Sequence, residues 1–331
     1  MVMEQRSSWR VSCYPEEGRY EIGRVIIDDE LWGKDVEGFR GSFHEARAIL
    51  NSIYESCKDK IRVRFLSTCG AFIYFDWPED VDSGCIGKDV WNPKEKAVMR
   101  LFEEGEKAVK KLLSGGLLSK LGEIADFITI GADSHDACGD YSVELVFLVN
   151  LKNGSIRGRT GKSYPTADQE KKLVRIKELE THFPLGQNEV LILGCHELKV
   201  FENRVRERAK EKKEQEQEEK RKKVKLLSPK RRNVVNEFTK LVKEKYRPTI
   251  ILHHPHTTNK ARTWKTAWSG LKKILEKVDI KLKAYASATV YYKLYEDEEC
   301  AKKKKIRLCD VCEATKYGSV VDIVVRAEDC P

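Results

Sequence analysis

The chain has 331 residues, of which 40% are hydrophobic and 35% are charged, and its formal net charge is +9. This length and apolar content suffice for a buried core and for two domains. No apolar run reaches the roughly 20 residues that cross a bilayer, and the N-terminus lacks the apolar core of a signal peptide. We therefore expect a cytoplasmic protein without a membrane partner, and the abundant Lys and Glu give it a thermophile-like composition.

The first half of the chain mixes strand and helix patterns. β-Branched and aromatic stretches predict strands, and apolar residues three or four positions apart predict amphipathic helices. Asn153-Gly154 predicts a hairpin turn, because Gly accepts a positive φ. The expected elements are strand 20–27, helix 43–57, strand 62–75, loop 76–93, helix 97–112, strand 125–130 and strand 143–150. These elements predict a mixed α+β domain over residues 1–184.

The second half alternates short apolar strands with amphipathic helices. Val190–Leu193 and Thr249–Leu252 are apolar on both faces, which is typical of buried parallel strands. The elements expected after them are helix 264–278, strand 283–291, helix 302–317 and strand 320–325. We therefore predict an α/β fold in which residues 185–331 form a Rossmann-like domain, a parallel sheet with helices on both faces.

A charged segment interrupts this second half. Residues 204–232 contain 14 basic and 6 acidic residues, so the rest of the chain is close to neutral. The segment has too few apolar positions for a buried stripe, which predicts a charged helical or disordered insert. One interpretation is a solvated surface element, and the other is contact with a nucleic-acid backbone. The expected contact residues are Lys220, Arg221, Lys222, Lys223, Lys230, Arg231 and Arg232.

Histidines follow both apolar strands. Val190–Leu193 leads into Gly194-Cys195-His196-Glu197, and Thr249–Leu252 leads into His253-His254-Pro255-His256. A long helical connection joins the two strands, so we expect a parallel pair whose carboxyl ends lie at one sheet edge. His196 and at least one of the later histidines are then predicted to line one pocket.

These residue types suggest a metal-dependent hydrolase. Imidazole is a common ligand of zinc and similar metals, so the expected ligands of a zinc or manganese ion are His196, His254 and His256. The expected catalytic residues are His196, Glu197, His253, His256 and Asp133, the last from a second polar cluster that also reads as a capped turn. Thr257, Thr258 and Asn259 precede the helix near Trp264 and are expected to bind an anion.

Other motifs leave alternatives or exclude functions. Cys195 is a candidate thiol nucleophile, with His253 or His256 as its base. Gly158–Ser163 imitates the end of a phosphate-binding loop, but Ile156 stands where the first Gly is required, so no NTPase loop is expected. Cys309 and Cys312 form a CxxC pair at helical spacing, which favours burial on a helix over a zinc site.

The function predicted from the sequence is a hydrolase that acts on a phosphorylated substrate, either a nucleotide or a nucleic acid. One alternative is a non-enzymatic binding module for nucleotides or nucleic acid with a basic contact segment. The other is a structural subunit of a complex, and a homo-oligomer is compatible with each interpretation.

Overall fold

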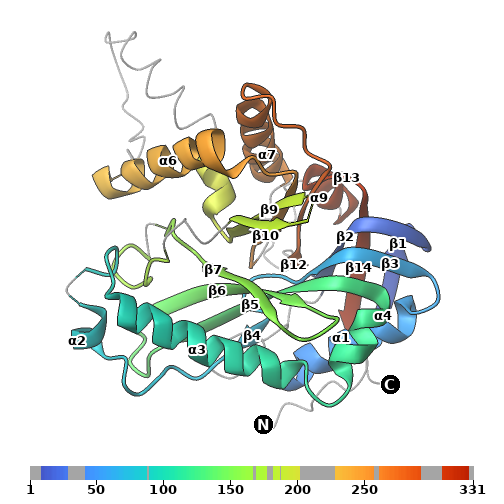
Figure 1. The fold of residues 1–331 in the computed structure, drawn as a ribbon, viewed down its shortest axis with the longest axis horizontal. Helices are drawn as coiled ribbons and strands as arrows, with labels where there is room; N and C mark the ends of the chain where they lie inside the picture. The colour runs from blue at the N-terminus through green and yellow to red at the C-terminus, as the bar shows by residue number, and fades with distance from the viewer. Residues whose placement is uncertain are drawn as a thin grey trace, which may run out of the picture.

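The computed structural model stacks two β-sheets face to face between two layers of helices (Figure 1). The structure describes residues 9–28, 42–87, 89–166, 169–176, 182–186, 188–201, 228–256, 261–291 and 308–327. Within these residues, no helix is long and apolar enough to cross a membrane.

The larger sheet contains nine described strands, and its main path runs in the order β1-β14-β2-β3-β5-β6-β7. β4 pairs with β5 and β12 pairs with β2 beside this path. The strands are β1 (Trp9–Tyr14), β2 (Gly18–Asp28), β3 (Ile61–Ser67), β4 (Ile73–Tyr74), β5 (Ala125–His135), β6 (Ser142–Asn150), β7 (Ile156–Gly161), β12 (Thr289–Tyr291) and β14 (Val320–Ala327). The sheet is mixed, since β14, β2, β3 and β5 are parallel neighbours while β5, β6 and β7 are antiparallel. The hairpin expected at Asn153-Gly154 joins β6 to β7, and Gly154 has the positive φ that such a turn requires.

The smaller sheet has five described strands in the order β13-β11-β10-β9-β8. They are β8 (His182–Leu185), β9 (Asn188–Gly194), β10 (Ile250–His254), β11 (Ala284–Ser287) and β13 (Lys316–Gly318). The three central strands are parallel to one another, and each edge strand is antiparallel to its neighbour. The expected parallel pairing of Val190–Leu193 with Thr249–Leu252 is confirmed, because Ile250 pairs with Val190 and Leu252 with Ile192.

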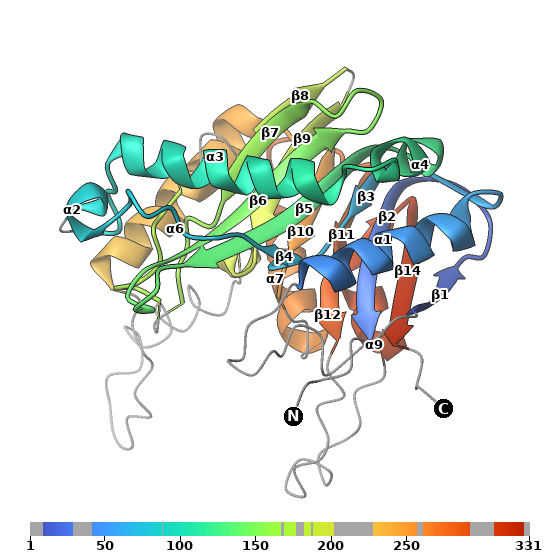
Figure 2. The same cartoon turned by 90° about the horizontal axis from the view of Figure 1, so that it is seen from below.

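The helices cover the two outer faces of the sandwich. Figure 2 shows α1 (Phe43–Cys57), α3 (Glu95–Leu112) and α4 (Leu117–Ile124) across the outer face of the larger sheet. α6 (Pro229–Leu241) and α7 (Ala261–Glu276) lie beyond the smaller sheet (Figure 1). The remaining helical segments are α2 (Ser83–Ile86), the 3-10 turn η2 (Glu197–Phe201), the π turn η3 (Val242–Tyr246) and α9 (Leu308–Ala314).

The inner faces of the two sheets form an apolar layer of their own. Val190, Ile192, Ile250 and Leu252 of the smaller sheet belong to one buried cluster with Phe65 and other side chains of the larger sheet. Their sequence neighbours Leu191, Leu193 and Ile251 belong to the cluster that includes the helices. Because side chains alternate along a strand, one face meets the second sheet and the other meets helices.

The Rossmann-like prediction is therefore wrong. Among the described residues, the smaller sheet has helices on one face only, and its other face packs against the larger sheet. The last strand, β14, lies in the larger sheet between β1 and β2. A strand covered by helices on both faces and a strand covered by a helix and a sheet are equally apolar, so the sequence pattern did not distinguish them. The division at residues 184 and 185 stays a prediction.

Gly131 of β5 tests how closely the loop after β3 packs onto the larger sheet. A Cβ added at Gly131 would lie 2.2 Å from the Cys69 carbonyl oxygen and 2.8 Å from the Gly70 Cα. We expect Gly131→Ala to lower the free energy of unfolding by about 1–3 kcal/mol, because backbone has to move. Urea denaturation followed by circular dichroism measures this change. Gly84→Ala is the matched control, since its nearest contact is the Asp82 side chain at 3.2 Å; an equal loss in both variants would contradict the close packing.

Candidate active site

The candidate site begins where β9 and β10 end side by side. In the parallel register His254 pairs with Gly194, so the residues that follow both strands emerge at the same edge. The backbone N–H of His256 donates to the Cys195 Sγ at 3.4 Å. Gly194 lets this edge approach the other sheet, because an added Cβ would lie 3.3 Å from the Lys162 Cα. The pairing of strands thus places a buried thiol against the facing sheet.

The facing sheet contributes a buried ion pair. Glu144 lies within β6, and Lys162 directly follows β7. The Lys162 ammonium donates to Glu144 Oε1 and to Gln169 Oε1, each at 2.7 Å. The exposed fractions of these two charged side chains are only 1% and 10%. Burial makes each charge costly alone, so the lysine and the glutamate depend on one another.

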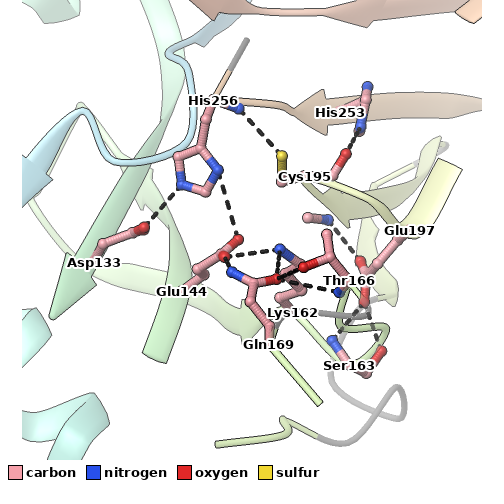
Figure 3. A network of polar contacts seen from close by, with 11 residues as sticks. Asp133, Glu144, Lys162, Ser163, Thr166, Gln169, Cys195, Glu197, His253 and His256 are labelled. Atoms are coloured by element: carbon pink, nitrogen blue, oxygen red, sulfur yellow. Dashed lines mark hydrogen bonds and ion pairs between the residues drawn. The ribbon is translucent and has the colours of Figure 1, made fainter. Parts of the chain in front are cut away.

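His256 connects this ion pair to a second carboxylate. Its Nε2 lies 2.8 Å from Asp133 Oδ2, and its Nδ1 lies 3.8 Å from Glu144 Oε2. Ligand-type atoms of Glu144, Cys195 and His256 all lie within 4.8 Å of one another. Figure 3 shows His256 between Asp133 and Glu144, with Cys195 close by and Lys162 beyond Glu144. Five ionisable side chains from two sheets therefore meet at one place.

The neighbouring charges favour the ionised forms of the thiol and the lysine. Burial alone raises the pKa of the Cys195 thiol, but the positive charges of His256 and His196 outweigh it and hold this pKa well below its usual value. Burial likewise lowers the pKa of Lys162, but Glu144 and Cys195 raise it above the usual value. The site can thus supply a thiolate next to a permanent cation. A cysteine nucleophile requires both of these features.

The Asp133–His256 pair holds one proton. Burial lowers the pKa of His256, but the negative charges of Glu144, Cys195 and Asp133 raise it well above the usual value. Burial raises the pKa of Asp133, and the imidazolium of His256 opposes that rise. With His256 protonated and Asp133 ionised, the pair carries no net charge. Since Lys162 and Glu144 also cancel, the cluster is neutral while Cys195 is a thiol.

Glu197, an expected catalytic residue, is a buried structural link. Its Oε1 accepts hydrogen bonds from the backbone N–H of Ser163 at 2.8 Å and from the Ser163 hydroxyl at 2.5 Å. Its Oε2 accepts from the backbone N–H of Gly194 at 2.6 Å. The carboxylate therefore joins the turn that contains Cys195 to the loop that contains Lys162.

His253 points away from the ion pair, toward the helix layer. Its ring packs on Trp264 and Trp268 of α7, and its Nδ1 lies 2.8 Å from the Ser287 hydroxyl. Its Nε2 lies 2.9 Å from the carbonyl oxygen of Cys195. Burial lowers the pKa of His253 to about 4, so the ring is neutral and donates one hydrogen bond to that carbonyl.

His254 points to the opposite face, between the sheets. Its Nδ1 lies 2.7 Å from the Thr68 carbonyl oxygen, and its Nε2 is buried without a hydrogen-bond partner among the described residues. Burial lowers the pKa of His254 to about 3. Strand alternation therefore separates the two adjacent histidines.

The prediction of a zinc or manganese site on three histidines is wrong. His254 faces Thr68, and neither His196 nor His254 belongs to either group of clustered ligand-type atoms in the described part of the chain. One group is Glu144, Cys195 and His256, beside which the Lys162 ammonium already supplies the cation. The other is Asp136, Cys138 and Asp140 on a polar turn. His196 is half-buried, and its Nδ1 has no hydrogen-bond partner among described atoms.

The described residues of the basic segment do not support nucleic-acid binding. Lys230 pairs with Asp89 at 2.9 Å, and Arg231 pairs with Glu170 at 3.5 Å, so these charges are matched within the chain. Arg232 is exposed on α6. The other expected contacts, Lys220, Arg221, Lys222 and Lys223, and the expected anion-binding residues, Thr257, Thr258 and Asn259, lie outside the described residues.

Sequence reasoning gave no catalytic role to Glu144 or Lys162. Lys162 lies in the Gly158–Ser163 stretch, which was excluded as a phosphate-binding loop. A signal was present, since Glu144 interrupts the apolar run Val143–Val149 and Lys162 closes a hairpin beside it. Charged residues inside such a strand are costly unless paired, but the partners are 18 residues apart.

Comparisons with known proteins give a likeness to solved structures only. No protein-family model and no curated protein matches the chain. An amidase from Nesterenkonia sp. has a TM-score of 0.45 at 10% identity, over 83% of this chain and 78% of that chain. A cysteine-to-alanine mutant of the Nesterenkonia AN1 amidase, from the nitrilase superfamily, has a TM-score of 0.44 at 11% identity over the same shares. A form of the AN1 amidase with acrylamide added at its active-site cysteine has a TM-score of 0.38 at 10% identity, over 81% of this chain and 78% of that chain.

The prediction of a hydrolase for phosphorylated substrates is wrong. The side chains that converge are a thiol, two carboxylates, an ammonium and one imidazole, rather than a set of histidines around a metal. The chemistry of this chain is inferred below from its own side chains.

Buried His253 and His254 predict a loss of stability in acid. Their folded-state pKa values, about 4 and about 3, lie below the unfolded value near 6.5. Their contribution is therefore complete above pH 6.5 and is lost as the pH falls toward 4, because unfolding takes up protons. We expect His254→Gln to reduce the slope of unfolding free energy against pH by about 1.4 kcal/mol per unit in this range.

Chemical denaturation at pH 7.5, 6, 5 and 4.5 measures this slope. His182→Gln is the matched control, since His182 is a half-buried histidine on β8 that pairs with Glu189 at 3.0 Å. Equal slopes in wild type and His254→Gln would contradict a neutral, buried His254.

Proposed function

We propose that this protein is a cysteine-dependent hydrolase that cleaves the carbon–nitrogen bond of carboxamides, with Cys195 as the nucleophile. The observation that carries the proposal is the buried Lys162–Glu144 ion pair, which lies beside the Cys195 thiol. A buried ion pair costs several kcal/mol of desolvation per ion. A fold gains little stability from such a pair, whereas a nucleophile gains a base and a cation from it.

The thiol supports covalent chemistry at a carbonyl carbon. A thiolate is a strong nucleophile toward acyl groups, and its attack forms a thioester that splits one difficult step into two. Cys195 is 5% exposed and directly follows the carboxyl end of β9, next to the end of β10. Ligands of open parallel sheets bind at such carboxyl ends. The backbone N–H of His256 supports the developing negative charge on Sγ.

The first half of the reaction transfers the Cys195 proton to Glu144. The thiolate then attacks the amide carbon, the carbon–sulfur bond forms, and the π electron pair moves to the carbonyl oxygen. Among the described residues, the Lys162 ammonium donates one hydrogen bond to Glu144 and one to Gln169. Its third N–H can donate to this oxyanion. The carbon–nitrogen bond then breaks as Glu144 returns its proton to the nitrogen, which leaves as ammonia or an amine.

The second half releases the acid. Glu144 takes a proton from water, the hydroxide attacks the thioester carbon, and the carbon–sulfur bond breaks. The sulfur leaves as the thiolate and regains its proton from Glu144. The sum is amide plus water giving carboxylic acid plus ammonia or amine. A leaving amine requires a proton donor, which the carboxylic acid form of Glu144 supplies, and this favours amides as substrates.

Substitutions at the site test this proposal. We expect Cys195→Ala and Lys162→Met to lower kcat/KM for amide hydrolysis by at least about 1,000-fold, and Glu144→Gln by about 100- to 10,000-fold. Ammonia release from a panel of aliphatic and aromatic primary amides measures the activity, and intact-mass spectrometry detects the thioester adduct. Cys138→Ala, at an exposed cysteine, is the control that keeps activity. Hydrolysis by Cys195→Ala, or no turnover and no adduct across the panel, would refute the proposal.

A further inference from the structure

We propose that His256 and Asp133 form a second acid–base unit of this site, in which His256 is the cationic partner of the Cys195 thiolate and Asp133 positions it. This inference rests on the proposed role of Cys195 as nucleophile. It assigns His256 a contact with the reacting atom that is independent of the Glu144–Lys162 pair.

The geometry holds the imidazole on three sides. Its Nε2 lies 2.8 Å from Asp133 Oδ2, and its Nδ1 faces Glu144 Oε2 at 3.8 Å. The third side lies against backbone, because a Cβ added to Gly70 would be 3.3 Å from ring atoms of His256. Pro255, whose carbonyl oxygen accepts from the Gly70 N–H at 3.2 Å, fixes the chain just before His256. The ring therefore has one orientation relative to Cys195.

The charges around the imidazole determine its protonation. The groups that face it are Asp133 of β5, Glu144 of β6, Lys162 after β7, and Cys195 and His196 after β9. His253 and His254 on its own strand are neutral, as described above. Two carboxylates therefore face a single ammonium, and an imidazolium at position 256 balances them. A neutral ring beside an ionised Asp133 would leave one buried negative charge without a partner, which is costly.

This balance separates the tasks of the two carboxylates. Glu144 exchanges a proton with the thiol, the leaving nitrogen and water. The Asp133 carboxylate contacts the His256 ring and acts on the thiol through it, so Asp133 is a positioning residue. An imidazolium beside Cys195 favours the thiolate that forms when the thiol proton passes to Glu144. Removal of the imidazolium should raise the thiol pKa.

The test titrates the thiol without any substrate. Iodoacetamide alkylates a thiolate by forming a carbon–sulfur bond as iodide leaves, so its rate against pH reports the thiolate fraction at Cys195. Peptide mass spectrometry assigns the modified cysteine, and Cys195→Ser gives the background. We expect the wild-type inflection to lie well below the ordinary cysteine value of about 8.5. In His256→Gln the inflection should rise by at least one pH unit, which makes alkylation about 10-fold slower or more at any pH well below the wild-type inflection.

Asp133→Asn is the second variant, because it keeps the imidazole and removes only the carboxylate. Its inflection should move in the same direction by a smaller amount. His182→Gln is the matched control, since it removes another half-buried histidine that pairs with a carboxylate, and its profile should equal the wild type. Circular dichroism and thermal unfolding identify which variants are folded.

Two results would overturn the inference: an unchanged inflection in folded His256→Gln or Asp133→Asn, or an equal shift in His182→Gln. These outcomes are distinct from failure of the proposed function. Amide hydrolysis with an unmoved alkylation profile refutes the second acid–base unit alone. If the wild type hydrolyses no amide but the alkylation profiles of His256→Gln and Asp133→Asn are shifted, the His256–Asp133 pair is supported and the amidase proposal is refuted.

Discussion

A charged lysine cannot be buried without an anion beside it, and the rest of this site depends on that constraint. Lys162 is 1% exposed, and Glu144 lies 2.7 Å from its ammonium. The charges that remain must cancel as well, which Asp133 and His256 do between them. In this neutral cluster a thiolate forms at Cys195 only if its proton stays nearby. The same balance that makes the buried charges tolerable therefore links ionisation of Cys195 to the charges of its neighbours.

The two-sheet sandwich explains why these groups meet. The larger sheet provides Asp133 and Glu144 from adjacent strands and Lys162 from the end of the next. The smaller sheet provides Cys195 and His256 from two parallel strands. The apolar layer between the sheets is close-packed, so it fixes their separation. Glu197 adds a direct link between the turn of Cys195 and the loop of Lys162, through Ser163 and Gly194.

The three histidines at the end of β10 lie in different environments although they are close in sequence. His253 supports the Cys195 carbonyl from the helix side, and His254 bonds Thr68 between the sheets. His256 follows the end of β10, so the alternation of side chains along the strand does not apply to it, and its ring contacts Asp133. Three histidines within four positions thus have three different environments. Two of them are neutral through burial, and the third is held protonated by carboxylates.

The sequence by itself determined the local elements and the place of the site. Periodicity predicted most of the helices and strands, and turn chemistry predicted the Asn153-Gly154 hairpin, because these depend on neighbouring residues. The handedness of crossover connections predicted the parallel pairing of β9 with β10. It also placed the site at the ends of those two strands, where Cys195 and His256 lie. Only the tertiary structure decided what covers the second face of the smaller sheet, because helices and sheets bury apolar strands equally well. It also decided the chemistry. Glu144 and Lys162 meet on neighbouring strands of the larger sheet, but only the packing of the smaller sheet on it brings Cys195 to them and makes their charges interact at low dielectric.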